Sequence, residues 1–212
     1  MKIIKLAIRS LAILMVFAGL SIFYGCPGCE FEMPISINSA SVTLIDNTGE
    51  KPTQSSSEFQ PREAIAFRVT LYDTTDYYDY DYYANSKAKP FSPIQAAYAL
   101  SCNETYVLQT RLESIRIFAL QDLTDEIKTT DEVTDLFVAE IDNYNTSNTL
   151  YYTLDKVVDA LNSFDFYWQP RISIDFFLTQ EPSSSSLSFE LHFLLDNGKT
   201  LIVPTPNIIV IS

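Results

Sequence analysis

The sequence predicts an antiparallel β-sandwich, Ig-like in general character, with two or three short helices inserted between the strands. Three observations favour this fold class. About eight segments alternate apolar and polar residues with the period of two that a half-buried strand requires. An Asn197-Gly198 pair between two of these segments is the dipeptide that tight hairpins prefer. No strand–helix–strand rhythm typical of a parallel sheet occurs along the chain.

The strands are predicted where every second residue is apolar. They cover residues 40–46, 63–72, 105–109, 113–120, 171–179, 187–195, 199–203 and 207–211. Because successive side chains of a strand point to opposite faces, one set in each run is expected to face the core. The inward set comprises Ile65, Phe67, Val69, Leu71, Ile115, Ile117, Ala119, Ile172, Ile174, Phe176, Leu187, Phe189, Leu191 and Phe193.

Two short helices are predicted from capping signals. Ser92 and Pro93 offer an N-cap followed by proline at the first helical position, which predicts a helix ending near Cys102. Thr129 and Glu132 have the spacing of a capping box, which predicts a short helix or turn at that point. Its inward side chains are expected to be Val133, Leu136 and Phe137.

A third helix is predicted over residues 153–163, with Thr153 as its N-cap. Apolar residues recur there with the spacing of one helical face, at Leu154, Val157, Val158 and Leu161. We expect this face to pack on a sheet.

The first 25 residues have the composition of an export signal. Lys2, Lys5 and Arg9 form a positive region, and residues 10–29 contain no charged side chain. Residues 11–24 are an apolar stretch of 14 residues, which suits a signal and is short for a bilayer span. The chain therefore divides into a signal peptide (1–25), a connector (26–39) and one folded domain (40–212). An uncleaved membrane anchor and a secretory signal cut elsewhere are the alternatives.

Gly25 and Cys26 end this stretch with a small residue followed by a cysteine. The arrangement resembles bacterial lipoprotein precursors, although Phe23 and Tyr24 stand where an aliphatic and a small residue are usual. The resemblance implies that Cys26 carries lipid such as palmitate and that the membrane is reached through this anchor, since two or three acyl chains attach stably. It also implies a location in the bacterial cell envelope, on the outer-membrane, periplasmic or surface face.

The charge excludes one class of partner. The chain has a net charge of −13, and removal of the signal takes away three of the 14 basic residues and none of the 27 acidic ones, which leaves −16. Such a surface repels nucleic acid and anionic lipid headgroups. We therefore expect no nucleic-acid partner, and we expect a soluble domain held by its tether.

Lipid at Cys26 leaves two cysteines, and export places them where disulfides persist. The sequence predicts a Cys29–Cys102 disulfide, with two unpaired thiols as the alternative. The bridge closes a loop of roughly 74 residues and stabilises the fold by about 4 kcal/mol in the chain-entropy account. Two cysteines and the single histidine, His192, fall short of a zinc set, so no metal or cofactor is predicted.

Residues 73–83 (DTTDYYDYDYY) contain four aspartates and five tyrosines and have no periodic apolar face. This composition predicts an exposed loop. It is a candidate binding loop for a protein or glycan, because tyrosines give contact area at low entropic cost. Its carboxylates could ligate Ca²⁺, although their spacing does not match an EF-hand; a solvated loop without a role is the alternative. The candidate residues are Asp76, Tyr77, Tyr78, Asp79, Tyr80, Asp81 and Tyr82.

The motifs of several enzyme classes are missing. His192 lies mid-strand on a polar face, no serine has a G-x-S-x-G surrounding, and five glycines provide no phosphate cradle. A carboxylate pair for glycoside hydrolysis has its best candidate in Asp165 near Trp168, for which a strand-entry turn is the alternative. We therefore predict that the protein is not an enzyme.

Several stretches together resemble uncharacterised bacterial cell-envelope lipoproteins. They are Gly25-Cys26, Cys29, the run ending at Cys102, the Asp-x-x-Thr-Asp-Leu-Phe run from Asp131, and the Leu-Asp-Asn-Gly-Lys hairpin. The resemblance implies no activity. The sequence thus predicts a lipid-anchored, non-enzymatic binding or structural protein. The alternative is a calcium-dependent glycan- or protein-binding adhesin that uses residues 73–83.

Overall fold

The computed structural model describes the chain at residues 30–49, 51–74, 103–141, 151–163 and 171–211. The chain divides into two units, one of residues 1–32 and 85–105 and the other of residues 33–84 and 106–212. Nearly all described residues belong to the second unit; of the first unit, residues 30–32 and 103–105 are described. No helix among the described residues is long and apolar enough to cross a bilayer.

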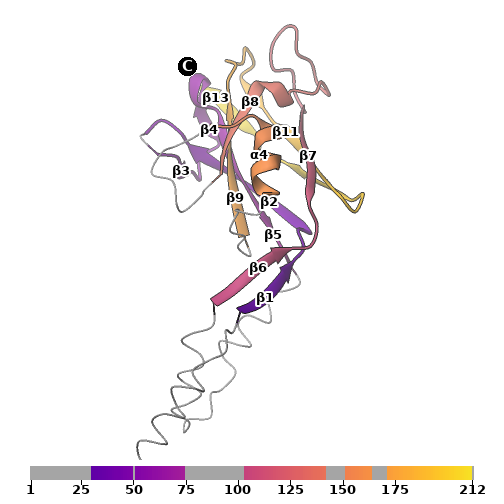
Figure 1. Ribbon diagram of the computed structural model, residues 1–212. Helices are drawn as coiled ribbons and strands as arrows, with labels where there is room; N and C mark the ends of the chain where they lie inside the picture. Colours follow the sequence, from indigo (N-terminus) through magenta and orange to yellow (C-terminus); the bar gives the residue numbers. More distant parts are fainter. Residues whose placement is uncertain (1–29, 50, 75–102, 142–150, 164–170, 212) are drawn as a thin grey trace, which may run out of the picture. The chain divides into compact units, whose positions relative to one another are not determined.

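The predicted fold class is confirmed, because the structure is mainly β, with antiparallel sheets and few short helices. The larger sheet has five strands in the order β3-β2-β5-β9-β8, and every neighbouring pair is antiparallel (Figure 1). In that order the strands cover Thr53–Gln54, Ser39–Asp46, Ala66–Tyr72, Arg171–Leu178 and Phe137–Ile141.

The second sheet has three antiparallel strands in the order β12-β11-β7, covering Thr200–Pro204, Phe189–Leu195 and Leu112–Ala119. Strands β11 and β12 form the predicted hairpin, but its loop has three residues, 196–198, instead of two. The Leu195 amide donates to the Lys199 carbonyl at 2.9 Å, and Gly198 has a φ of 77°. A two-residue type I′ turn needs positive φ at both central residues, whereas here Gly198 alone has it.

Two smaller sheets complete the strands of the described chain. One has the order β10-β13-β4, with bounds Ser186–Leu187, Ile208–Ile211 and Phe59–Pro61; β13 and β4 run parallel, with Ile209 opposite Phe59. The other pairs β1 (Glu30–Ile35) with β6 (Asn103–Leu108). Strand β1 lies where the sequence suggested only a connector.

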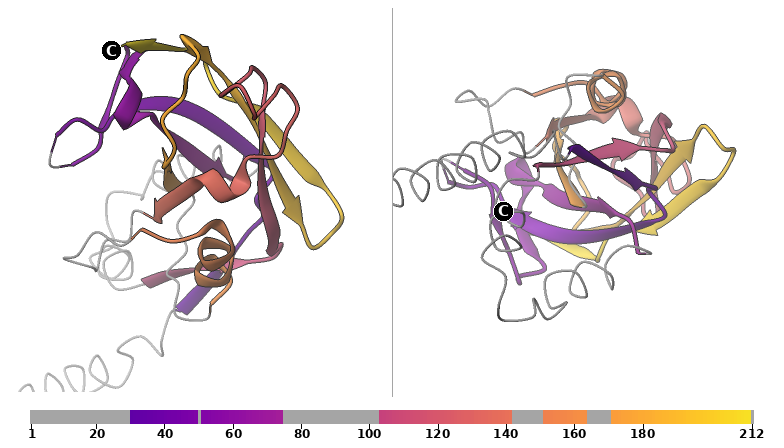
Figure 2. Two further views of the ribbon diagram at one scale, coloured as in Figure 1. Left: turned by 90° about the horizontal axis from the view of Figure 1, so that it is seen from above. Right: turned by 60° about the horizontal axis from the view of Figure 1, so that its bottom comes forward.

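Phenylalanines from both main sheets meet in the core, which makes the arrangement a sandwich. Figure 2 shows the strands of these sheets from two further directions. Phe189 of β11 lies 5.1 Å from Phe137 of β8 and 6.1 Å from Phe67 of β5, measured between ring centroids. Phe67 also stacks on Phe176 of β9 at 5.5 Å. Aromatic pairs at these separations add to the stabilisation from burial. All inward residues predicted above for residues 63–72, 113–120, 171–179 and 187–195 are buried.

A second, smaller apolar cluster lies on the outer face of the five-stranded sheet. Ile45, Ala66 and Phe177 are buried there, and Val138 packs against them. The Tyr151 ring meets Phe177 edge-on at 5.2 Å. Tyr151 itself remains exposed. The buried Gln60 of β4 lies against the same cluster and donates to the carbonyls of Ile45 and Ala66.

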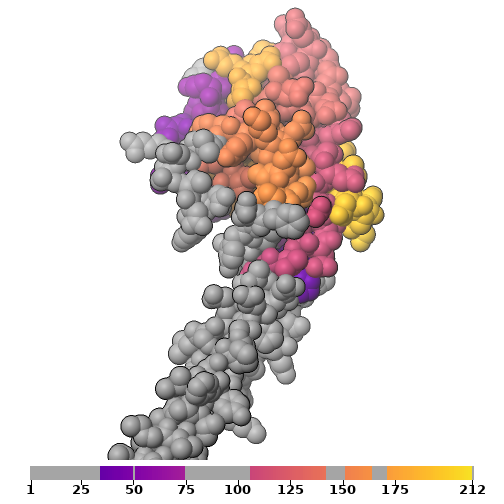
Figure 3. All heavy atoms as spheres, in the orientation of Figure 1, coloured from indigo at the N-terminus to yellow at the C-terminus, as the bar shows by residue number. Residues whose placement is uncertain are grey.

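The predicted helix over residues 153–163 is confirmed as α4 (Leu154–Leu161), whose surface is orange in Figure 3. Its four predicted inward residues are all buried, and it packs against β7 and β8. At its end the Asn162 amide group binds the backbone of Leu112 twice: Nδ2 donates to the carbonyl at 2.7 Å, and Oδ1 accepts from the amide at 3.2 Å. These bonds fix the helix to β7.

The predicted capping box at Thr129 does not form. The Thr129 hydroxyl donates to Asp122, and Thr134 donates to Glu132. The short helix or turn predicted at this point does occur, as a turn at residues 129–130 followed by the 3-10 helix η2 (Thr134–Leu136). Both threonine hydroxyls bond to acidic residues that precede them in the sequence, and the chain turns between the two threonines, where Thr130 has a φ of 76°. The helix predicted at residues 92–102 lies outside the described residues.

A pair of phenylalanine substitutions tests the core. Phe67 is fully buried, whereas Phe59 is 56% exposed. We expect Phe67→Ala to lower the free energy of unfolding by about 3–5 kcal/mol and Phe59→Ala to lower it by less than about 1 kcal/mol. Urea denaturation monitored by circular dichroism measures both. Equal losses for the two variants would contradict this account of the core.

Candidate functional site

Most of the residues that the sequence singled out lie outside the described part of the chain. These are Cys26, Cys29, Cys102, the loop residues 76–82, and the carboxylate candidate Asp165 with Trp168. The lipid site, the disulfide, the binding loop and the carboxylate pair therefore stay predictions.

The first residue of the predicted loop is described, and it serves the fold. Asp73 is buried, and its carboxylate accepts hydrogen bonds from the Ser36 amide and from Nδ2 of Asn38, both at 2.8 Å. Asn38 in turn accepts hydrogen bonds from the amide and hydroxyl of Thr74. The segment that leaves β5 is thus tied to the chain just before β2. Asp73 is a structural residue, which the composition of residues 73–83 did not distinguish from the other aspartates.

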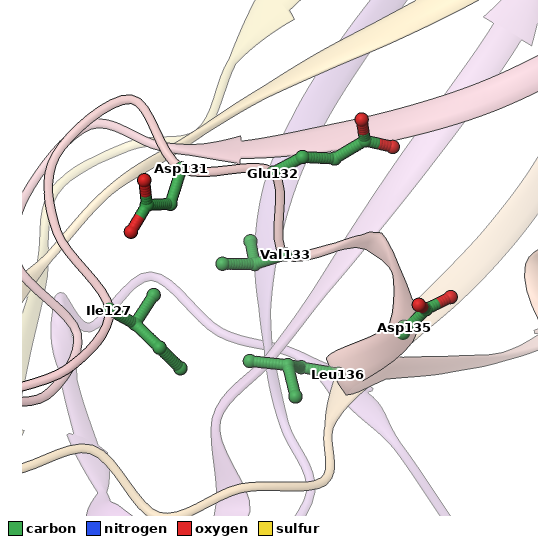
Figure 4. A pocket seen from close by; sticks show the side chains of 6 residues that line it. All are labelled: Ile127, Asp131, Glu132, Val133, Asp135 and Leu136. Carbon is green, nitrogen blue, oxygen red and sulfur yellow. The ribbon is translucent and has the colours of Figure 1, made fainter.

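A hollow of about 400 Å³ opens beside η2. It is lined by Ile127, Asp131, Glu132, Val133, Asp135 and Leu136, and we call these six residues the acidic hollow (Figure 4). In Figure 4 the three aliphatic side chains point toward one another across it, while the three carboxylates lie around it and point apart. Val133 is buried and the acids are exposed, so the hollow has an apolar floor and an acidic rim.

Hydrogen bonds made by residues 122–134 hold the wall of the hollow. The Lys128 amide donates to Asp131 Oδ2 at 2.7 Å, which closes the turn before the rim. Thr134 Oγ1 accepts from the Ile117 amide at 3.0 Å and donates to Glu132 at 2.9 Å, which ties the rim to β7. The wall therefore has a fixed shape although it contains no long element.

Asp122 accepts several of the hydrogen bonds in this wall. Its carboxylate accepts from the amide of Thr129 at 2.9 Å, from the hydroxyl of the same residue at 3.0 Å, and from Lys128 Nζ at 3.2 Å. These bonds hold the pKa of Asp122 below its ordinary value of 3.8, and the bond from the Thr129 amide has the largest effect. The Ser184 hydroxyl also donates to the Asp122 carbonyl, so this residue joins the loop to the chain before β10.

The rim carboxylates do not converge on one point. Asp131 and Glu132 already accept bonds from Lys128 and Thr134, and all three rim acids are directed apart. Acid–base hydrolysis needs two carboxyl groups that face one bond. Within the described ranges, no group of three or more His, Cys, Asp or Glu side chains is placed to hold a metal ion.

Two other polar groupings lie on the outer sheet faces. Arg68 of β5 and Asp175 of β9 form a two-pronged ion pair at 2.6 and 2.7 Å. His192, which the sequence placed on a polar face, is half-buried with its Nε2 2.7 Å from Glu190 and its ring 4.7 Å from that of Phe118. Both groupings join neighbouring strands or residues of one sheet, and neither borders the hollow.

The sequence predicted two of the residues that line the acidic hollow but did not predict the hollow itself. It placed Val133 and Leu136 inward from the spacing after Thr129, and it noted nothing about Ile127. The missing signal is tertiary, since Ile127 reaches the hollow through a turn in which its amide donates to Thr124 Oγ1 and its carbonyl accepts from the Leu123 amide. No periodicity marks such a turn.

No family model matches this chain. No curated protein matches it either. Among solved structures it is similar to the C-terminal domain of the Streptococcus agalactiae AgI/II polypeptide BspA, with 8% identity and a TM-score of 0.26 over 82% of this chain and 50% of that one. A second chain, described as BspA_C_WT, gives 9% identity and a TM-score of 0.24 with the same coverage.

This chain thus spans about half the length of both solved chains. Similarity at this level assigns no function, and the fold described above rests on the strands themselves. The resemblance to envelope lipoproteins remains a prediction from the sequence.

The Asp122 bonds predict how stability depends on pH. A carboxylate whose pKa is lowered by folding stabilises the fold above its unfolded pKa, and this stabilisation is lost as the pH falls through the lower folded value. We therefore expect Asp122→Asn to lower the melting temperature near neutral pH, and we expect the difference from the wild type to shrink between about pH 5 and about pH 2.

Asp125→Asn is the matched control, because Asp125 is exposed and makes no side-chain hydrogen bond or ion pair with the described residues. Thermal melts of the three proteins across this pH range provide the measurement. A difference between Asp122→Asn and the wild type that stays constant with pH would count against the Asp122 bonds.

Proposed function

We propose that this chain is a lipid-anchored, non-enzymatic binding or structural protein of the bacterial cell envelope. The observation that carries the proposal is the N-terminal pattern, in which a positive region and a 14-residue apolar stretch lead to Gly25 and Cys26. Lipid at Cys26 attaches the chain to a membrane, and the strongly acidic domain stays off the anionic headgroups.

The geometry of the domain supports a contact role. The sandwich core is closed by aromatic packing, and its outer faces carry paired polar groups such as Arg68 with Asp175. The acidic hollow presents an apolar floor to solvent with carboxylates around it. A concave apolar patch with a charged rim is the arrangement through which proteins commonly contact a partner.

Metabolic labelling with palmitate in a bacterial host tests the anchor. We expect the full chain to incorporate the label and to sediment with membranes. Cys26→Ala is expected to lose the label, because the acyl chains have no attachment point. Cys29→Ala is the matched control, three residues away, and it is expected to keep the label and the membrane location.

Two outcomes would contradict the proposed lipid anchor. One is a Cys26→Ala protein that still carries palmitate, and the other is a wild-type chain that never acquires it. An uncleaved signal without lipid would leave the wild type in the membrane fraction unlabelled, so mass spectrometry of the mature N-terminus separates the two kinds of attachment.

A further inference from the structure

We propose that the acidic hollow docks a basic segment of a partner protein, in which lysine or arginine side chains flank a large apolar side chain. The inference deepens the proposed binding role and rests on it, but it does not depend on lipid at Cys26. It is argued from the floor of the hollow, the charge around it, the direction of its carboxylates and the rigidity of its wall.

The floor accounts for the apolar part of the partner segment. Ile127 and Leu136 are only partly buried and pack at the edge of the main core, whereas Val133 beneath them is 2% exposed. The three side chains converge in Figure 4. A volume of about 400 Å³ accommodates one leucine- or phenylalanine-sized side chain. Covering Ile127 and Leu136 would remove apolar surface from water, which favours association.

The charge accounts for the basic part. Residues 121–135 contain six acidic side chains and one basic side chain, a net charge of −5. The one basic residue, Lys128, is already paired with Asp122 at 3.2 Å. In the described part of the chain, Asp135 on the rim makes no hydrogen bond or ion pair with its side chain, and the same holds for Asp125 and Glu126. This excess attracts a cationic segment and steers its approach.

The direction of the carboxylates favours a peptide over a metal ion. Asp131, Glu132 and Asp135 point apart around the hollow, whereas Ca²⁺ requires six or more oxygens about one point. Several separated cationic groups can each meet one of the carboxylates. Lysine and arginine also lay an aliphatic stem on apolar surface while the charged end reaches the rim.

The wall is already in its bonded shape before a partner arrives. The bonds from Lys128 to Asp131, from Thr134 to Glu132 and from Thr129 to Asp122 fix the rim without a ligand. A preformed site loses less conformational entropy on binding. The ordering cost therefore falls on the partner segment.

Fluorescence anisotropy with a defined peptide tests the proposal. The probe is a fluorescein-labelled heptapeptide of five lysines and two leucines, added to the full chain in a neutral detergent, with empty micelles as the blank. We expect saturable binding at low salt that weakens as salt is raised to about 0.5 M, because exposed charges are screened. A peptide with serine in place of both leucines is expected to bind about 10-fold more weakly, because the floor is left uncovered.

Asp135→Asn is the decisive variant, since its side chain supports nothing in the described fold. We expect it to weaken binding of the leucine peptide by about 2- to 5-fold. Asp196→Asn is the matched control, because Asp196 is an exposed acid in the β11–β12 loop. This loop lies next to Leu112 at the start of β7, whereas the residues of the acidic hollow follow the end of β7 at Ala119. This control is expected to bind as the wild type does.

Leu136→Asn tests the floor, with an expected loss of about 10-fold. A melting curve establishes whether this variant folds; if it does not, the Asp135 comparison and the serine peptide still decide. Equal affinities for Asp135→Asn and Asp196→Asn, or for the two peptides, would overturn the docking site. So would the absence of binding at about 1 mM peptide and low salt. None of these results bears on palmitate at Cys26, so the two proposals fail separately.

Discussion

The packing of Phe189 against Phe67 and Phe137 is the interaction on which the rest of the structure depends. It joins the two main sheets, and it requires each strand to keep its apolar residues on one face. A slip of one residue in any central strand would turn that face outward, so the core also fixes the register of β5, β9 and β11. The outer faces carry paired polar groups such as the Arg68–Asp175 fork, and the small apolar cluster of Ile45, Ala66 and Phe177. The loops, and the acidic hollow among them, are positioned by where the strands end.

The ends of the strands leave backbone groups that the sheets cannot satisfy, and a few amide and carboxylate side chains bind them. Gln60 is buried; its Nε2 donates to the carbonyls of Ile45 and Ala66, and its Oε1 accepts from the Ala66 amide. Asn162 does the same for Leu112 and so attaches α4 to β7. Through these hydrogen bonds, Gln60 and Asn162 hold neighbouring segments together at the margins of the core.

Periodicity predicted most of the core and little of its margins. The alternation in β5, β7, β9 and β11 and the helical spacing in α4 are local patterns, and each predicted inward face is buried because one face of each element must be covered. Three other features depend on partners distant in sequence or on the φ of one residue. They are the parallel β13–β4 pair, the absence of the capping box at Thr129, and the three-residue loop at Gly198. The acidic hollow depends on the same kind of information, because Ile127 joins it only through a turn.

The parallel pairing of β13 with β4 has a consequence for the order in which the protein folds. Ile209 lies opposite Phe59, so this sheet cannot form until the chain has been synthesised as far as residues 208–211. Pairings between such distant segments are slow because a long loop must close first. Until then Phe59, which is exposed even afterwards, belongs to an unpaired strand, and such strands are the usual starting points of aggregation. This sheet is therefore the last of the described sheets to be completed, because its pairing needs residues 208–211.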